Sequence, residues 1–157
     1  GDPSIPFIYW LLIATIAIPD EKESKWKMPS QVYLSALIVL CIGYFMGGIL
    51  KIFSPSWANG SAMQIILGLP NTRFGFIENL SNIIPSWIFV IITFSVILIE
   101  LFAPVFLIIK NTRKMWWILL TAMHILVLFC FTITQVSIGM LLYHLFLLDL
   151  AWIKKIS

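Results

Sequence analysis

The sequence predicts an all-α integral membrane protein with about five transmembrane helices and an external loop that contains a short interfacial helix. Hydrophobic residues make up 61% of the 157 residues and charged residues only 11%, and the mean hydropathy is +1.01. Soluble domains carry about 25% charged residues, so this composition excludes a soluble domain. The polar stretches are too short to fold alone, which leaves a single transmembrane domain over residues 1–157. The first residues contain neither Met nor a basic leader, and we expect a processed or incomplete chain.

Apolar runs long enough to cross a bilayer define the predicted helices. A crossing needs about 20 residues. The last two helices come from one run, which as a single helix would be about 58 Å long and is therefore expected to fold into a hairpin. The longest connection, residues 54–86, carries several prolines and glycines and an apolar stretch at 63–69 that predicts one or two interfacial turns. The predicted spans are residues 5–18, 31–53, 87–109, 115–133 and 137–153.

Basic residues predict the orientation of these helices, because Lys and Arg in short loops favour the cytoplasmic face. Five helices place loops 19–30 and 110–114 and the C-terminus on one face. Loop 54–86 is then expected to be external. The cytoplasmic face holds eight of the ten basic residues, namely Lys22, Lys25, Lys27, Lys110, Arg113, Lys114, Lys154 and Lys155.

Titratable side chains inside apolar segments are the first candidates for a functional site, because charge is costly in a bilayer. Counted from the basic flanks, Glu100, His124 and His144 each lie about 15 Å from the cytoplasmic face, on three different helices. If their faces converge, they form a buried polar cluster. In the structural alternative, Glu100 bonds to Thr121 or Ser95, and the histidines bond to backbone carbonyls or to each other.

Lys51 is expected near the external end of its helix, about 31 Å from Ser30 along the axis. Its ordinary role would be that of an interfacial lysine whose ammonium group reaches the surface. A lysine in an apolar pocket can instead lose its proton, which makes Lys51 the candidate catalytic base. Asp149 lies close to Lys154 and Lys155 and is more simply explained as their partner in an interfacial ion pair.

Two short motifs flank the start of the long loop. Residues 44–51 have the sequence YFMGGILK, and residues 57–62 have the sequence WANGSA. Together they resemble the small-residue, lysine, tryptophan and glycine pattern of the HTTM superfamily, which contains vitamin K-dependent gamma-carboxylase. The resemblance implies that Lys51 is the base that activates a reduced quinone. It also implies a site that includes the loop residues Trp57, Asn59 and Gly60.

The second half of the chain agrees with the same family. Residues 100–104 (ELFAP), the basic turn at Arg113, His124 and residues 138–149 resemble its later helices, so the resemblance covers residues 32–149. Bacterial members related to sporulation-delaying protein B are similar in size, which implies a bacterial inner membrane. A single lysine stands where the carboxylase has a pair, and we do not expect glutamate carboxylation. The expected role is maturation or export of a secreted peptide, or binding of a quinone or lipid.

Two other functions stay open at this point, as does the question of whether the chain is an enzyme. His124 and His144 lie at equal predicted depth on consecutive helices, an arrangement that permits bis-imidazole ligation of haem b in an electron-transfer subunit. The chain could instead be an accessory subunit that contacts a membrane protein partner through its apolar surface. Topology and anionic lipids explain the net charge of +3, so no nucleic-acid partner is expected. No other metal motif is present.

Overall fold

Most of the residues that the computed structural model of the chain describes are helical. The described part contains six helices, and no residue of it belongs to an extended strand. Three helices are long and apolar enough to cross a membrane, namely α2 (Ser30–Ile52), α6 (Ser86–Ile108) and α7 (Lys110–Cys130). Such helices are typical of a membrane protein. The described residues are 8–9, 11–13, 28–73, 75, 79, 82–132 and 135–148. For Gln135 only the backbone is described.

The three long helices correspond to the second, third and fourth predicted spans. The fifth, residues 137–153, corresponds to α8 (Gln135–Phe146), which has 12 residues, and its expected end lies outside the described residues. Most of the first predicted span, residues 5–18, also lies outside the described residues. The same is true of residues 19–27 in the loop predicted at 19–30. The structure therefore supports three membrane-crossing helices, and the predicted total of five is not confirmed.

The loop expected at residues 110–114 is helical instead and forms the start of α7. Only Ile109, in an extended conformation, separates α6 from α7. Arg113 explains this sharp connection, because its Nε and Nη2 atoms donate to the carbonyl oxygens of Leu107 and Ile108 at 2.6 and 3.0 Å. A basic side chain that was expected in a solvated loop thus satisfies the last carbonyls of one helix while it begins the next.

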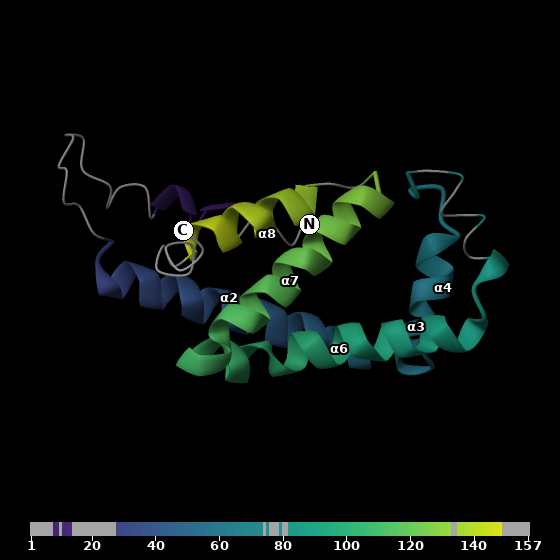
Figure 1. The fold of residues 1–157 in the computed structure, drawn as a ribbon, viewed down its shortest axis with the longest axis horizontal. Coiled ribbons are helices and arrows are strands. Elements are labelled where there is room, and N and C mark those ends of the chain that lie inside the picture. The colour runs from purple at the N-terminus through teal and green to yellow at the C-terminus, as the bar shows by residue number, and fades with distance from the viewer. Residues whose placement is uncertain are drawn as a thin grey trace, which may run out of the picture.

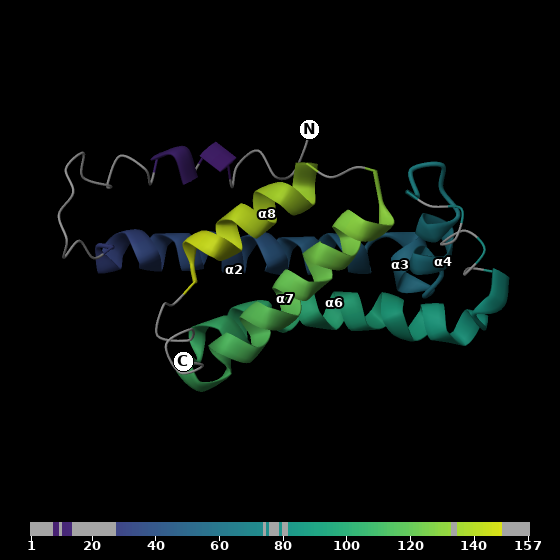
Figure 2. The same ribbon diagram turned by 45° about the horizontal axis from the view of Figure 1, so that its top comes forward.

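The helices α2 and α6 run antiparallel and form the most extensive helix pair (Figures 1 and 2). From the end of α6, α7 turns back and crosses this pair, and α8 follows α7 and returns beside α2. The Tyr143 hydroxyl of α8 donates to the Ala36 carbonyl of α2 at 2.9 Å, which joins these two helices inside the core. Large core side chains from all four helices are fully buried, including Leu40, Leu107, Leu120 and Tyr143.

Two short helices, α3 (Pro55–Ala58) and α4 (Ala62–Leu67), follow α2. Helix α4 lies against the first half of α6, and α3 contacts α2 and α4 (Figure 1). Gly60 joins α3 to α4 with φ +82°, a conformation that favours glycine. A Cβ atom at Gly60 would also lie 3.0 Å from the side chain of Val90 on α6. The apolar segment 63–69, in which one or two turns were expected, overlaps α4.

Gly48 allows α2 to approach α6 closely. A Cβ atom there would lie 2.9 Å from Leu101 Cγ and 3.1 Å from the Leu101 backbone nitrogen. We therefore expect Gly48→Ala to lower the free energy of unfolding by about 1–3 kcal/mol, because backbone atoms cannot rotate away. Alanine by itself favours a helix by about 1 kcal/mol, so a net loss would report the contact.

Titration with SDS in mixed micelles, followed by circular dichroism, measures this loss. Gly68→Ala is the control, because a Cβ atom there would make only ordinary contacts, 3.5 and 3.7 Å from the carbonyl oxygens of Ile65 and Gln64. Equal stabilities of Gly48→Ala, Gly68→Ala and the parent protein would contradict the close approach of α2 to α6.

Candidate functional site

Lys51 and Glu100 form an ion pair between α2 and α6. Lys51 Nζ donates to Glu100 Oε2 at 2.5 Å, and the two side chains are 24% and 10% exposed. Gly47 leaves room for the carboxylate, since a Cβ atom there would lie 3.2 Å from Oε2. Opposite charges withdrawn from solvent must stay paired, because an isolated charge in such a place is strongly destabilising.

This pairing differs from the separate roles expected for the two residues. Depth counted along each helix placed Lys51 near the external end and Glu100 in the other half of the membrane, but the axial offset of α2 against α6 brings them together. The alternative partner Thr121 donates to the Trp117 carbonyl of its own helix at 2.8 Å. Asp149 lies outside the described residues, so its ion pair stays a prediction.

Trp57 covers the Lys51 ammonium group. Lys51 Nζ lies 5.2 Å from the centre of the Trp57 ring, within the range of a cation–π interaction. Asn59 and Gly60, the other expected loop residues, form the turn after α3. The Asn59 side-chain oxygen accepts hydrogen bonds from the Ser61 backbone and hydroxyl at 2.9 and 2.7 Å. The described contacts therefore bring one of the three loop residues to Lys51 and give the other two a role in shaping the turn.

His124 and His144 meet at the hydroxyl group of Tyr44. The Tyr44 oxygen lies 2.9 Å from His124 Nε2 and 3.2 Å from His144 Nε2, and all three side chains are buried. His144 Nδ1 lies 2.7 Å from the Met140 carbonyl oxygen. Sequence reasoning missed Tyr44 as a functional residue. Its signal was its position seven residues before Lys51, two turns earlier on the same side of α2.

The histidine geometry does not fit the haem alternative. Axial ligation would need one nitrogen of His124 and one of His144 on opposite sides of a flat macrocycle. Here the Nε2 atoms of both rings are directed at one Tyr44 hydroxyl, the ring centroids are 5.8 Å apart, and the rings are inclined by 46°. Among the described residues, no group of three or more His, Cys, Asp and Glu side chains could hold a metal ion.

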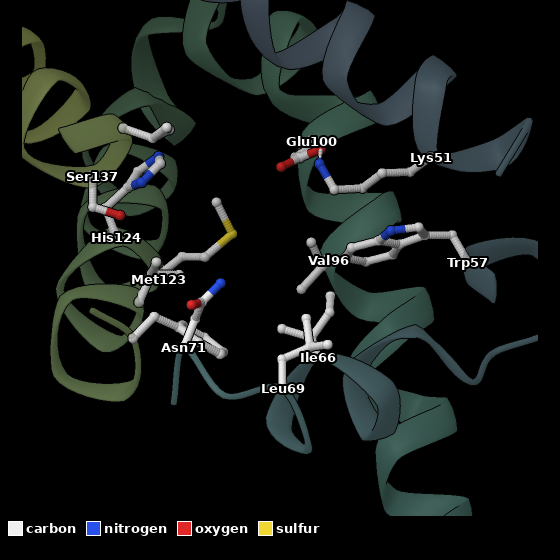
Figure 3. Close-up of a pocket in the computed structure, with 13 residues that line it drawn as sticks. Lys51, Trp57, Ile66, Leu69, Asn71, Val96, Glu100, Met123, His124 and Ser137 are labelled. Carbon is white, nitrogen blue, oxygen red and sulfur yellow. Dashed lines mark hydrogen bonds and ion pairs between the residues drawn. The ribbon is translucent and has the colours of Figure 1, made fainter. Parts of the chain in front are cut away.

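A pocket of about 350 Å³ lies between the ion pair and His124. Figure 3 shows Lys51, Glu100 and Trp57 on one side and His124 and Ser137 on the facing side. Ile66 of α4 and Leu69 just after it also line the pocket, and most of the lining is hydrophobic. The polar side chains that line it are Lys51, Glu100, Asn71, His124 and Ser137.

The arrangement therefore combines a charged pair and a hydrogen-bonded imidazole on opposite walls of an apolar pocket. Glu100 and His124 share this pocket but no hydrogen bond is described between them, so the expected three-residue cluster is divided into two parts. Comparison of the chain with protein-family models, with curated proteins and with solved structures found no match.

Proposed function

We propose that this chain is a membrane protein that binds an amphipathic molecule of the quinone or lipid class and supports proton transfer at Lys51 and Glu100. One observation carries the proposal: the ion pair lines a largely apolar pocket of about 350 Å³. Small-molecule sites are commonly concave and apolar with a few convergent polar groups. Ionisable groups within apolar membrane helices mark functional sites by default.

The resemblance to the HTTM superfamily supports the same proposal. Tyr44, Lys51 and Trp57 belong to the two motifs that carry the resemblance. Lys51 and Trp57 line the pocket, and Tyr44 bonds to His124, which also lines it. Family membership, a bacterial inner membrane and a secreted-peptide partner remain predictions from the sequence.

The chemistry that fits this pair is transfer of a proton from a ligand hydroxyl group. The ammonium group of Lys51 has three N–H donors, one of which binds Glu100, so the others can bind a ligand oxygen. A hydroxyl bound there gives its proton to the Glu100 carboxylate, and the oxygen left behind pairs with the Lys51 cation. One anion replaces another, so the step creates no additional net charge in the membrane. In this scheme Glu100 is the base, and Lys51, expected to be the base, stabilises the oxyanion.

Binding of 2-methyl-1,4-naphthoquinone and of its hydroquinone tests the proposal. The purified protein in lipid nanodiscs is titrated by calorimetry, with empty nanodiscs as background. We expect Lys51→Met to weaken binding about tenfold or more, because it removes a charge-assisted hydrogen bond worth about 1.5–3 kcal/mol. Lys110→Met makes the same change at an exposed lysine and should bind like the parent. Equal binding by Lys51→Met would overturn the role of the pair, and no binding by the parent would favour an accessory subunit.

A further inference from the structure

The hydrogen-bond chain behind the pocket has a fixed direction. The Met140 carbonyl oxygen can only accept, so His144 Nδ1, 2.7 Å away, carries a hydrogen. The other nitrogen of a neutral imidazole is then bare, and His144 Nε2 accepts the hydrogen of the Tyr44 hydroxyl. The Tyr44 oxygen must in turn accept from His124, so His124 Nε2 carries a hydrogen.

This direction leaves His124 with a bare nitrogen on the pocket side. When Nε2 of a neutral ring carries the hydrogen, Nδ1 is an acceptor. His124 is 8% exposed, and its Nδ1 has no hydrogen-bond partner within the described part of the chain. His124 lines the pocket, whereas Tyr44, bonded to Nε2, does not. The Nδ1 edge of the ring is therefore the edge on the pocket side, and because the Nδ1 atom itself is buried, a ligand reaches it by displacing neighbouring side chains.

Ser137 presents a second polar atom on the same wall. Its Oγ is buried, with the residue 1% exposed, and it too lacks a hydrogen-bond partner among the described residues. Figure 3 shows Ser137 next to His124, across the pocket from Lys51 and Glu100. Buried polar atoms without partners are destabilising and uncommon in folded proteins. Two of them on one pocket wall indicate a place where a ligand completes the hydrogen bonding.

Proton conduction is a weaker explanation for this chain of hydrogen bonds. The chain ends at the Met140 carbonyl, which accepts a hydrogen bond but does not pass a proton on, and His144 is fully buried. The arrangement instead holds His124 in one tautomer, with its acceptor directed to the pocket.

We infer that His124 Nδ1 and Ser137 Oγ form a second ligand-binding position, which takes a hydroxyl or N–H donor of the molecule that Lys51 binds from the facing wall. The inference rests on the proposed function and adds a requirement to it. The bare nitrogen accepts the ligand hydrogen, and the Ser137 hydroxyl can bond to the same ligand atom. An anionic head group would be repelled by the nitrogen lone pair, so this wall selects a hydrogen-bond donor over an anion.

The tautomers can be measured directly by nitrogen-15 NMR of protein labelled in histidine. The chain has two histidines, so the spectrum contains two pairs of ring nitrogens. We expect opposite neutral tautomers, with the hydrogen on Nε2 in His124 and on Nδ1 in His144. The variant His124→Gln assigns the signals by removing one pair. A hydrogen on Nδ1 of His124 would overturn the inference.

A matched pair of probes tests the binding position. The hydroquinone of 2-methyl-1,4-naphthoquinone, kept anaerobic, offers two hydroxyl donors, and its dimethyl ether offers none. We expect the hydroquinone to bind about tenfold more tightly than the ether. It should shift the Nδ1 signal of His124, whereas the ether should not. Ser137→Ala should reduce the preference severalfold, while Ser35→Ala, at an exposed serine of α2, should retain it.

The outcomes separate the inference from the function on which it rests. Binding of the hydroquinone without a shift of His124 Nδ1 would overturn the second binding position and leave the proposed pocket intact. Equal affinity for the two probes would overturn hydroxyl binding at both walls. Failure of the parent protein to bind either probe would overturn both. One result needs only the parent protein and no assignment: two histidines that carry their hydrogens on the same ring nitrogen would overturn the inference even if a variant does not fold.

Discussion

Lys51→Met should lower the free energy of unfolding by about 3–5 kcal/mol, because it leaves the Glu100 carboxylate buried without its partner. That side chain is only 10% exposed, and Lys51 Nζ is the hydrogen-bond partner described for it. Glu100→Leu should have a comparable effect, since it leaves the ammonium group of Lys51 unpaired. The double variant removes both charges from an apolar environment and should recover most of the lost stability.

A double-mutant cycle, with unfolding by SDS in mixed micelles, measures the coupling between the two residues. We expect the loss in the double variant to be smaller than either single loss, so that it falls short of the sum of the single losses by at least about 3–5 kcal/mol. Lys110→Met is the control and should change stability by less than about 0.5 kcal/mol, because that lysine is exposed. Strictly additive losses would contradict the ion pair. The double variant should also fail to bind the naphthoquinone, which separates the stability of the pair from its function.

Tyr44→Phe should cost about 1–3 kcal/mol for each of the two imidazole nitrogens that lose their partner. Phenylalanine keeps the buried ring in place between α2, α7 and α8, so the loss reports the hydroxyl group and not the packing. His124 Nε2 and His144 Nε2 both depend on this hydroxyl, at 2.9 and 3.2 Å. The same SDS titration measures the effect.

Tyr33→Phe is the matched control for Tyr44→Phe. Tyr33 is partly buried on the same helix, and no hydrogen bond of its hydroxyl is described. Tyr33→Phe should therefore lower the free energy of unfolding by less than about 0.5 kcal/mol. Removal of the Tyr44 hydroxyl should also alter the histidine signals in the nitrogen-15 spectrum, because the direction of the hydrogen-bond chain depends on it. Unchanged stability together with an unchanged spectrum would show that the hydroxyl does not bridge the two rings.

Much of the helical architecture could be predicted from apolar length alone. The bounds of α2 and α6 agree with the predicted spans to within one residue at each end, since a membrane-crossing helix is recognised by a local run of apolar residues. The start of α7 was missed because Arg113 bonds to carbonyl groups at the end of α6. The sequence alone does not distinguish a basic residue in a loop from a basic residue that caps the preceding helix.

The candidate residues were also visible in the sequence, because ionisable groups stand out in apolar segments. Lys51, Glu100, His124 and His144 were selected on this ground, and all four belong to the pocket wall or to the hydrogen-bond chain behind it. Only the tertiary structure decided their pairing. The offset between α2 and α6, with Gly48 packed against α6, brings Lys51 to Glu100 although their depths along separate helices differ.

Tyr44 and Ser137 show where sequence reasoning ends. A tyrosine or serine in an apolar helix is ordinary, so neither residue was selected as a candidate for the site before the fold was known. Tyr44 became the centre of the histidine pair because α7 and α8 each bring a ring to α2, from 80 and 100 residues further along the chain. The sequence by itself thus determined which segments form apolar helices and which of them carry ionisable groups. The packing of distant helices decided which groups meet, because the offset and rotation between helices depend on all their contacts and on no local pattern.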